Sequence, residues 1–459
     1  MKRRVLAIII VQGRESYALD SRSCDSEISF TFERRCPEGI VRKRIFATSR
    51  MEVSHLKIDE AIIETALRNK LSDETVRVLE IQLNCMSEKG LNFLSDLYKA
   101  HIRYTASSTK KKEETKSERS ISLVIKAEPL RELSRDIVRQ QNLFLIELKV
   151  LRDVLPKMKE FVYHQLGPNL LCGFDDPRIL VMENLINRGF IMKDRQKGLS
   201  VEHCRLVIEQ LARLHAGSVA VLEKDPQIIE SFIDTGIVST KCPKAFIRMM
   251  EVSLLRIANE IQKWSSEKYA SAANKLIKLS PTIGTRCIDA YNYDVDEFCV
   301  LNHGDCWINN LMFRENEKGQ PIEVLLVDYQ MAVYTSPVID LLYFLNICPE
   351  FHVKYDNDDY FLKLYLHTLQ ETMKNIACKR KPPTMEQLKE AIHKRRIYAV
   401  FSGVVLYLRM MGSKEDTEDF EELLTKLLGE TKMDVFRNPD AVKLAHKMIP
   451  IMNERGYFD

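Results

Sequence analysis

Two short segments in the second half of the chain most strongly limit what it can fold into. Residues 301–313 read LNHGDCWINNLMF and contain Asp305 and Asn310, while residues 323–330 read EVLLVDYQ, an apolar strand that delivers Asp328 at its end. Only a short, hairpin-like connection separates the two segments. We therefore expect the two carboxylates and the amide to converge on one point of the fold.

These three side chains match the requirements of phosphoryl transfer, which needs hard oxygen ligands for Mg²⁺ and a separate carboxylate beside the acceptor hydroxyl. Asn310 and Asp328 would hold Mg²⁺ against nucleotide phosphates. Asp305 would orient the acceptor hydroxyl and take its proton. His303, which completes the spacing HxDxxxxN, is expected to fix the loop by hydrogen bonding and not to transfer protons.

Two other chemistries fit this segment less well. A thiol or serine hydrolase would need an oxyanion or triad signature, and the residues around Cys306 show none. A metal hydrolase using His303 and Asp305 would need a second His-rich motif for the remaining ligands, which the sequence does not supply.

The periodicity of apolar residues predicts mixed α and β elements followed by a helix-rich region. The expected elements are a helix over 55–83, strands over 91–104 and 121–126, a helix over 130–155, a strand over 178–182, a helix over 201–220 and mostly helices beyond 243. His215 follows the apolar stripe of the helix over 201–220 and is expected to be a core or supporting residue, not a catalyst. We expect a smaller α+β part up to about residue 182 and a larger α-rich part after it.

Glu147 lies within the apolar stripe of the helix predicted over 130–155. Burying a carboxylate there costs free energy unless a cation or hydrogen-bond donor pairs with it. Lys126, the last residue of the preceding apolar strand, is the natural partner of Glu147. From the residues alone, however, the pair could equally be an incidental ion pair with no role in function.

The segments 301–313 and 323–330, with PVIDLLYF shortly after, resemble the ecdysteroid kinase-like family, a relative of choline kinases and aminoglycoside phosphotransferases. The likeness covers roughly residues 55–450, and it also rests on GLNFLSDLY at 90–98, LVIK at 123–126, FLIELKVLRDVLP at 144–156, MENL at 182–185 and LARLHAGS at 211–218. The resemblance implies an α+β, protein-kinase-like fold with two lobes, a small β-rich N-terminal lobe and a larger α-helical C-terminal lobe.

The resemblance also implies the residues that bind the nucleotide. Lys126 is similar to the strand lysine that contacts the phosphates of ATP, and Glu147 to its helix partner. Glu183 and Leu185 match the hinge between the lobes, where backbone groups meet adenine.

In the second half of the chain the resemblance implies Asp305 as the catalytic aspartate and Asn310 and Asp328 as Mg²⁺ ligands. Asp340 is expected to cap a helix and to brace the catalytic loop together with His303. The function that follows is an ATP-dependent kinase that transfers the γ-phosphoryl group to a hydroxyl of a small alcohol.

The phosphate-covering turn departs from the family pattern. The family has two glycines flanking a short polar stretch, whereas SEKGLNFLS at 87–95 keeps only Gly90 before Asn92. A glycine-poor turn restricts the approach of the backbone to phosphate. The alternative function is therefore a catalytically weak pseudokinase that acts as a binding or scaffold protein, against which the intact Asp305, Asn310 and Asp328 argue.

A protein kinase is a poorer match. The sequence has HGD in place of HRD, and no APE-like end follows Asp328. The residues between Asp328 and Pro337 are too few to form a peptide-docking surface.

The N-terminus has two interpretations. Residues 1–11, MKRRVLAIIIV, sit at the lower edge of a secretory signal, but no clear cleavage site follows. We therefore expect a poorly ordered N-terminal extension over 1–50, followed by an N-lobe over 51–182 and a C-lobe over 183–459.

Composition limits the partners. With 68 Lys and Arg against 65 Asp and Glu, the net charge of +3 is too small for a binder of nucleic acid. The 11 cysteines are scattered without a CxxC pair, which indicates reduced thiols in the cytoplasm. No apolar stretch approaches the roughly 18 residues that span a bilayer. We expect a cytoplasmic monomer that acts on a small-molecule hydroxyl, with no nucleic-acid or membrane partner.

The acceptor pocket is expected in the helical region after residue 220, which is rich in Met and aromatic residues. The candidates are Phe232, Phe246, Met249, Met250, Trp264, Tyr343, Phe344, Tyr398, Phe401, Tyr407, Met410 and Met411. Most of them must be ordinary core. An apolar subset lining the cleft would favour an ecdysteroid or another hydroxylated small molecule, such as a detoxification intermediate, over choline, whose cation calls for an acidic or aromatic cage.

Overall fold

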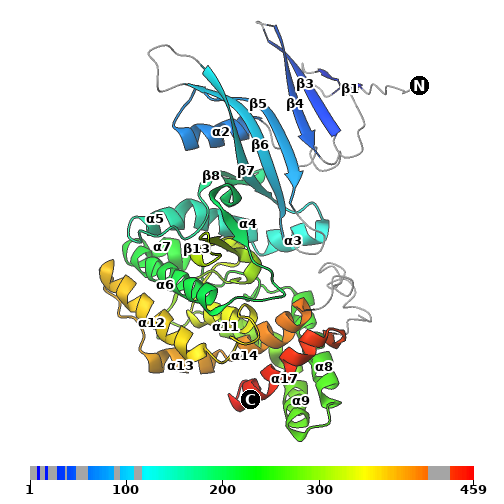
Figure 1. Ribbon diagram of the computed structural model, residues 1–459, viewed down its shortest axis with the longest axis vertical. Coiled ribbons are helices and arrows are strands. Elements are labelled where there is room, and N and C mark those ends of the chain that lie inside the picture. Colours follow the sequence, from blue (N-terminus) through cyan, green and yellow to red (C-terminus); the bar gives the residue numbers. More distant parts are fainter. Residues whose placement is uncertain are drawn as a thin grey trace, which may run out of the picture. The chain divides into compact units, whose positions relative to one another are not determined.

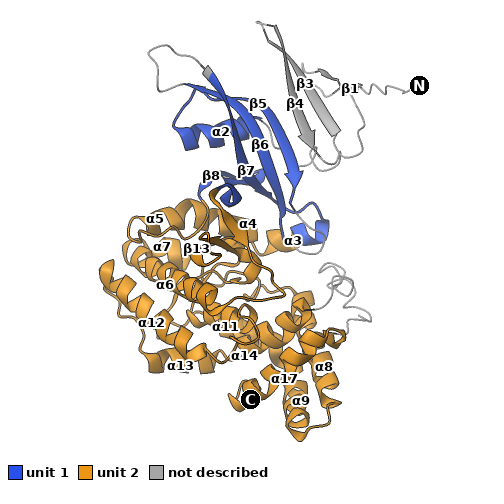
Figure 2. Ribbon diagram, viewed as in Figure 1, with its two compact units in different colours: residues 1–135, 169–187 blue, residues 136–168, 188–459 orange. Residues whose placement is uncertain are grey.

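The computed structural model of the chain divides into two compact units (Figures 1 and 2). Unit 1 comprises Met1–Arg135 and Asn169–Asn187, and unit 2 comprises Asp136–Pro168 and Arg188–Asp459. The structure describes residues 60–86, 94–107, 116–411 and 435–459, together with the backbones of four strands nearer the N-terminus. Apart from those strand backbones, the extension predicted over 1–50 lies outside the described residues. The lobe boundary between residues 182 and 183 stays a prediction.

Unit 1 is built on a mainly antiparallel sheet. In the described backbone the strand order is β1-β2-β3-β4-β5-β6-β7-β9-β8, with β4 and β5 running parallel. The strands are β1 (Ile8–Ile10), β2 (Ser16–Ala18), β3 (Ile28–Cys36), β4 (Gly39–Ala47), β5 (Arg77–Cys85), β6 (Asp96–Ser107), β7 (Lys116–Ala127), β8 (Leu170–Asp175) and β9 (Arg178–Glu183).

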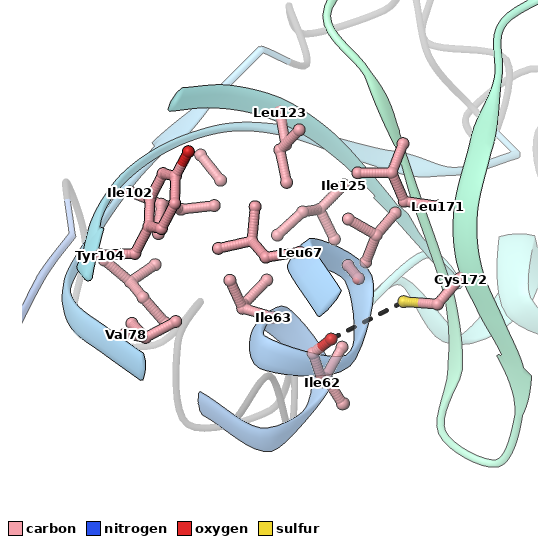
Figure 3. Close-up of a cluster of buried hydrophobic side chains, with 14 of the residues drawn as sticks. Ile62, Ile63, Leu67, Val78, Ile102, Tyr104, Leu123, Ile125, Leu171 and Cys172 are labelled. Atoms are coloured by element: carbon pink, nitrogen blue, oxygen red, sulfur yellow. Dashed lines mark hydrogen bonds between the residues drawn. The ribbon is translucent and has the colours of Figure 1, made fainter. Parts of the chain in front are cut away.

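Helix α2 (Glu60–Leu71) packs its apolar face against this sheet (Figure 3). Ile63 and Leu67 are fully buried in the same cluster as Ile102 of β6 and Ile125 of β7. The Cys172 thiol of β8 lies 3.7 Å from the carbonyl oxygen of Ile62. Alternation of buried and exposed residues along β6 places one face of the strand in this core.

The helix predicted over 55–83 is wrong beyond Leu71. Ser72 adopts the left-handed conformation with φ 50°, and the Asp73 carboxylate accepts the backbone N–H of Thr75 at 2.8 Å. The chain therefore turns and continues as strand β5. The predicted strands over 121–126 and 178–182 are confirmed within β7 and β9.

The helix predicted over 130–155 is divided. It consists of α3 (Glu132–Gln140), α4 (Leu143–Lys149), a π-helical segment (Val150–Val154) and α5 (Leu155–Lys159). The break after α3 lies at Asn142, whose φ of 54° is left-handed, a conformation that asparagine tolerates better than most residues.

Unit 2 is mostly helical, and with the β-rich unit 1 it confirms the α+β class. Its helices are α6 (Val201–Lys224), α7 (Pro226–Glu230), α8 (Lys244–Gln262), α9 (Glu267–Leu279), α10 (Ile283–Tyr291), α11 (Val338–Ile347), α12 (Asp358–Asn375), α13 (Met385–Lys394), α14 (Ile397–Ala399), the π-helix η6 (Val400–Tyr407), α15 (Leu408–Met410) and α17 (Pro439–Glu454), with short 3₁₀ turns at η3 (Ser280–Thr282), η4 (Ile308–Asn310), η5 (Tyr329–Met331) and η7 (Val435–Arg437). Its strands are β10 (Phe190–Met192), β11 (Val300–Asn302), β12 (Leu311–Glu315), β13 (Pro321–Leu326) and β14 (Val333–Thr335). The 3₁₀ turn η2 (Leu185–Arg188) lies mostly in unit 1, which ends at Asn187.

Two small antiparallel sheets of unit 2 adjoin the segment that contains Asp305, Asn310 and Asp328. One has the order β10-β12-β13, and the other pairs β11 with β14. Strand β11 leads into residues 303–310, and β13 ends two residues before Asp328. The predicted helix over 201–220 is confirmed within α6, which begins after Ser200, whose hydroxyl accepts the N–H of His203.

None of the helices in the described segments is long and apolar enough to cross a membrane. Each cysteine within those segments is a free thiol.

Lys354 is fully buried in unit 2, and we predict that it makes stability depend on pH. Its ammonium donates to the carbonyl oxygen of Asn346 at 2.8 Å and lies 4.4 Å from the centre of the Tyr407 ring. Burial lowers the pKa of Lys354 from 10.5 to about 7. Between these two values the unfolded chain binds a proton that the folded chain does not, so the free energy of unfolding rises with pH, by up to about 1.4 kcal/mol per pH unit.

The measurement is denaturant unfolding of the wild type and of Lys354→Met at several pH values from 7 to 10.5. The difference between the two proteins cancels the other titrating groups, and a lost hydrogen bond contributes only a constant offset. We expect the stability of the wild type relative to Lys354→Met to increase with pH across this window. A difference that is constant with pH would show that Lys354 stays charged in the folded protein.

Candidate active site

The loop that follows β11 is held by the buried carboxylate of Asp340, in the first turn of α11. Asp340 accepts the backbone N–H groups of His303 at 2.7 Å and Gly304 at 2.8 Å. The Nε2 atom of His215 on α6 lies 3.2 Å from the same carboxylate, and the hydroxyl of Tyr365 lies 2.8 Å from Nδ1 of His215. Such charge-assisted hydrogen bonds are short and strong, so Asp340 fixes the loop backbone at the base of the site.

His303 connects the loop to the end of β13. Its Nε2 donates to the carbonyl oxygen of Val327 at 3.0 Å, and its Nδ1 accepts the backbone N–H of Asp305 at 3.3 Å. Because a carbonyl oxygen can only accept and a backbone N–H can only donate, these contacts select the neutral tautomer with the proton on Nε2. The imidazole therefore has a positioning role in this arrangement.

Asn310 joins the two parts of the motif. Its Nδ2 donates to the carbonyl oxygen of Asp305 at 2.9 Å and to Oδ2 of Asp305 at 3.0 Å. The backbone N–H of Val327 donates to the carbonyl oxygen of Asn310 at 3.0 Å. The structure thus brings together Asp305, Asn310 and the residue that precedes Asp328.

Asp328 follows β13 in the left-handed conformation, with φ 67°. A non-glycine residue in this region is unusual and costs conformational energy, least for Asp and Asn. The carboxylate is half-buried, and its Oδ2 lies 3.4 Å from Nε2 of Gln330. The turn at this residue directs the chain into η5 immediately after the strand.

The Asp305 carboxylate has a second donor. The hydroxyl of Tyr343 on α11 donates to Oδ1 of Asp305 at 2.6 Å. Burial raises the pKa of the Asp305 carboxyl to about 7, and the negative charges of Asp328 and Asp340 act in the same direction, whereas the hydrogen bonds from Tyr343 and Asn310 oppose the shift. A divalent cation bound beside this carboxyl would lower its pKa again.

Three tyrosines surround this carboxylate and its loop. The Tyr343 ring stacks on that of Tyr398, with centroids 6.1 Å apart, and the hydroxyl of Tyr398 lies 2.9 Å from that of Tyr291. Tyr291 in turn donates to the carbonyl oxygen of Gly304 at 3.5 Å. The tyrosines therefore connect α10, α11 and α14 to the Asp305 carboxylate and to the backbone of Gly304, the residue before it.

The donor set fits Mg²⁺. The Nδ2 atom of Asn310 is engaged by Asp305, so its Oδ1 is the atom that can face a cation, and Asp328 supplies a carboxylate. Oxygen ligands of this type, completed by phosphates and water, are those that Mg²⁺ prefers. Among the described residues no group of three or more His, Cys, Asp or Glu side chains could hold a metal ion.

Two of the nucleotide residues predicted in unit 1, Lys126 and Glu183, lie on its sheet. Lys126 is buried in β7, where it pairs with Leu97 of β6 and Leu180 of β9. Glu183 ends β9, and its carboxylate accepts the backbone N–H and the Nδ2 of Asn169 at 2.9 and 2.7 Å. Leu185, which follows, is buried.

All of these nucleotide assignments, including those of Lys126, Glu183 and Leu185, stay predictions. Glu147 is buried in α4 of unit 2, whereas its predicted partner Lys126 belongs to unit 1. Gly90 and Asn92 of the predicted phosphate turn lie outside the described residues.

A small pocket in unit 2, with room for about one water molecule, lies beside the loop that follows β11. It is lined by Arg195, Trp307, Ile308, Ile347, Tyr407, Met410 and Met411. Tyr407, Met410 and Met411 were among the residues predicted for the acceptor pocket, whereas Arg195 and Trp307 were not.

The bond from Tyr343 to Asp305 was also missed from the sequence, although Tyr343 was among the aromatic candidates. The sequence does contain a sign of this contact. Tyr343 lies three residues after Asp340 on one helix, and residues three apart share a helix face. The face that presents Asp340 to the loop therefore presents Tyr343 as well.

We predict that Gly304 tolerates no side chain. Its φ is 81°, and a Cβ atom would lie 2.0 Å from the carbonyl oxygen of Met331. Gly319 is a matched control, because its φ is 73° but nothing lies within 4 Å of its Cβ position. We expect Gly319→Ala to cost about 1–2 kcal/mol for the left-handed conformation alone.

Gly304→Ala should cost clearly more, about 2–4 kcal/mol, because the clash adds to that strain. Denaturant unfolding of the two variants measures the difference. Equal losses of stability would show that the loop can move away from Met331 at no cost.

The α+β architecture and the geometry of this loop agree with the protein-kinase-like fold expected from the sequence. A model of the ecdysteroid kinase-like family matches residues 89–378, which is more than half of the chain. The chain belongs to the ecdysteroid kinase-like family.

Solved structures similar to this chain include two small-molecule kinases. A choline kinase from Cryptosporidium parvum Iowa II has 12% sequence identity and a TM-score of 0.42, covering 87% of this chain and 100% of the other. An amicoumacin kinase, hAmiN, in complex with AMP-PNP, Ca²⁺ and Ami, has 11% identity and a TM-score of 0.35, covering 85% of this chain and 99% of the other. No curated protein sequence matches the chain.

Proposed function

We propose that this protein transfers the γ-phosphoryl group of ATP to a hydroxyl group of a small alcohol. The observation that carries the proposal is the hydrogen bonding of Asn310 to both the backbone and the carboxylate of Asp305, next to the turn that presents Asp328. Family membership supports the general class of reaction.

In the proposed reaction Asp305 acts on the acceptor. Its carboxylate accepts a hydrogen bond from the acceptor hydroxyl and takes the proton as the new oxygen–phosphorus bond forms. The bond between the γ-phosphorus and the bridging oxygen breaks, and ADP leaves with that oxygen. Tyr343 and Asn310 hold the two oxygens of Asp305, so the carboxylate is oriented before the acceptor binds.

Asn310 and Asp328 would hold Mg²⁺. Bound there, the ion would neutralise negative charge on the transferred group and the leaving ADP. Lys126, by resemblance to the family's strand lysine, would contact the nucleotide phosphates. Asp340, His303 and His215 position the loop and touch no reactant.

We extend the proposal to an acceptor with an apolar body, an ecdysteroid or a hydroxylated detoxification intermediate. Membership of the ecdysteroid kinase-like family supports this acceptor class.

Tyr343→Phe tests the positioning of Asp305. We expect kcat to fall about tenfold, because one hydrogen bond to a charged group is lost, while the KM for ATP stays unchanged. Steady-state kinetics with both substrates measures this split. Phe retains the ring that stacks on Tyr398, so a large fall in thermal stability would instead indicate a structural role.

The substrate proposal is tested by competition. Steroid alcohols, choline, ethanolamine and an aminoglycoside are offered together with γ-labelled ATP, and the labelled products are separated. We expect label in the steroid alcohol fraction. Label in choline or the aminoglycoside alone would overturn the apolar acceptor but keep the kinase activity.

A further inference from the structure

The peptide group between Gly304 and Asp305 is held on both sides. Its carbonyl oxygen, which belongs to Gly304, lies 3.5 Å from the hydroxyl of Tyr291 on α10. Its N–H, which belongs to Asp305, donates to Nδ1 of His303 at 3.3 Å. The orientation of this peptide group sets the direction in which the Asp305 side chain leaves the backbone. Tyr291 therefore acts on the residue that takes the acceptor proton in the proposed reaction.

The hydroxyl of Tyr291 is itself oriented by Tyr398. The two hydroxyl oxygens lie 2.9 Å apart, and both side chains are buried. Each hydroxyl has one proton to donate, whereas a carbonyl oxygen can only accept, so Tyr291 donates to Gly304 and accepts from Tyr398. The hydroxyl of Tyr398 thus directs the proton of Tyr291 toward the loop.

The ring of Tyr398 supports Asp305 by a second route, through Tyr343. The rings of Tyr398 and Tyr343 stack at an interplanar angle of 26°. The hydroxyl of Tyr343 donates to Oδ1 of Asp305 at 2.6 Å. Tyr398 therefore supports the carboxylate through Tyr343 and the peptide group that carries it through Tyr291.

The backbone of Tyr398 is fastened beside Tyr343. Tyr398 lies in α14, directly before the π-helix η6, and π-helical segments are frequent at functional sites. The hydroxyl of Ser402 in η6 lies 2.8 Å from the carbonyl oxygen of Tyr398 and 3.4 Å from that of Leu342 on α11. The ring of Phe401 packs on that of Tyr398, with centroids 5.6 Å apart. These contacts fix the position from which Tyr398 acts.

Packing alone does not require the hydroxyl groups of Tyr291 and Tyr398. A buried hydroxyl gives up its hydrogen bonds to water, so the bond to its protein partner adds only a modest net stability. Phe at both positions would fill nearly the same volume with no polar group to satisfy. The distinctive effect of the hydroxyl pair therefore lies where the pair ends, at the carbonyl oxygen of Gly304.

We propose that Tyr291 and Tyr398 are positioning residues for phosphoryl transfer, and that their linked hydroxyl groups hold the peptide before Asp305 so that its carboxylate meets the acceptor hydroxyl. This inference rests on the proposed kinase function and deepens it. The two tyrosines touch no reactant, and they act only through Gly304 and Tyr343.

Hydrogen–deuterium exchange of the full chain tests this role without turnover. Peptides from residues 301–310 report on the amides of the loop. We expect these amides to exchange about 3- to 10-fold faster in Tyr398→Phe, because the loss of one neutral hydrogen bond eases local opening by about that factor. Unchanged exchange in this variant would overturn the inference, whatever the activity of the protein.

Steady-state kinetics measure the positioning itself. Tyr291→Phe and Tyr398→Phe should each lower kcat about 3- to 10-fold, with the KM for ATP unchanged. Because the two hydroxyls act as one unit on Gly304, the double variant should lose little more than Tyr291→Phe alone. A merely structural role would lower thermal stability and leave kcat unchanged, which would overturn the inference, as would losses that multiply in the double variant.

The matched control is Tyr269→Phe on α9. Tyr269 is also buried, and its hydroxyl lies 2.8 Å from Nδ1 of His446, outside the loop. This variant should leave both kcat and the exchange of residues 301–310 at their wild-type values. An equal fall of kcat in Tyr269→Phe would show a general effect of losing a buried hydroxyl and would overturn the inference.

The two measurements separate this inference from the proposed function. Faster exchange of the loop in Tyr398→Phe, in a protein that transfers no phosphate, would support the hold on Asp305 and overturn the proposed function. Transfer by the wild type, with kcat unchanged in Tyr291→Phe and Tyr398→Phe, would leave the proposed function standing and overturn the role of the two tyrosines.

Discussion

Replacement of Asp305 by Asn is expected to lower kcat by a factor of about 10²–10⁴, the usual contribution of a positioned general base. The amide cannot take the proton of the acceptor hydroxyl. In the wild type the Tyr343 hydroxyl and the Asn310 amide both donate to the carboxylate. The NH₂ group of the new asparagine would face one of these two donors, so one of the hydrogen bonds would be lost. Steady-state phosphoryl transfer with saturating ATP measures the effect.

The control for this variant is Asp359→Asn on α12. Asp359 is 78% exposed and lies 3.5 Å from Lys389, so its replacement changes the net charge equally without affecting the loop. Nucleotide binding by Asp305→Asn should remain close to that of the wild type. Transfer at the wild-type rate in this variant would remove Asp305 from the mechanism.

Asp328→Asn is expected to abolish most of the Mg²⁺ dependence of nucleotide binding. Asparagine tolerates the left-handed backbone at this position, φ 67°, so this substitution removes the charge with less strain than Ala would bring. Removing a carboxylate ligand should reduce the gain in ATP affinity caused by Mg²⁺ by about tenfold or more, since even the outer partners of metal ligands contribute that much.

Titration calorimetry with ATP, in Mg²⁺ and in EDTA, gives the two affinities for each protein. Affinity in EDTA should be similar for the wild type and for Asp328→Asn, which controls for folding. An unchanged ratio of the two affinities would show that Asp328 does not hold the metal.

The contact between Asp305 and Asn310 was predictable from the sequence, because the two residues lie close together in the chain. Asp305 and Asn310 are five residues apart, and Asp328 ends the next apolar strand, so their spacing limits them to one region. Their hydrogen bonds were not predictable in detail, since the bond from Tyr343 to Asp305 depends on how α11 packs on the loop. Arg195 and Trp307 come together only through the fold.

Local periodicity was a poorer guide where a helix gives way to another element. The apolar spacing before Leu71 is helical, but beyond it the same residue types form strand β5, and the turn at Ser72 depends on the hydrogen bonds of Asp73. In the region after residue 130, the left-handed Asn142 divides one predicted helix into separate segments. Periodicity identifies the buried face of an element more securely than its end.

The most direct test of the central claim follows the label of γ-³²P-ATP in the wild-type protein and in Asp305→Asn, with Mg²⁺ and a hydroxylated steroid acceptor. The products are separated into ATP, free phosphate and phosphorylated acceptor. We predict that the wild type moves the label to the acceptor and that Asp305→Asn, which still binds ATP, does not. Label that remains in ATP in the wild type despite tight Mg²⁺-ATP binding, or that reaches the acceptor equally in both proteins, would contradict the proposed kinase and its catalytic residue.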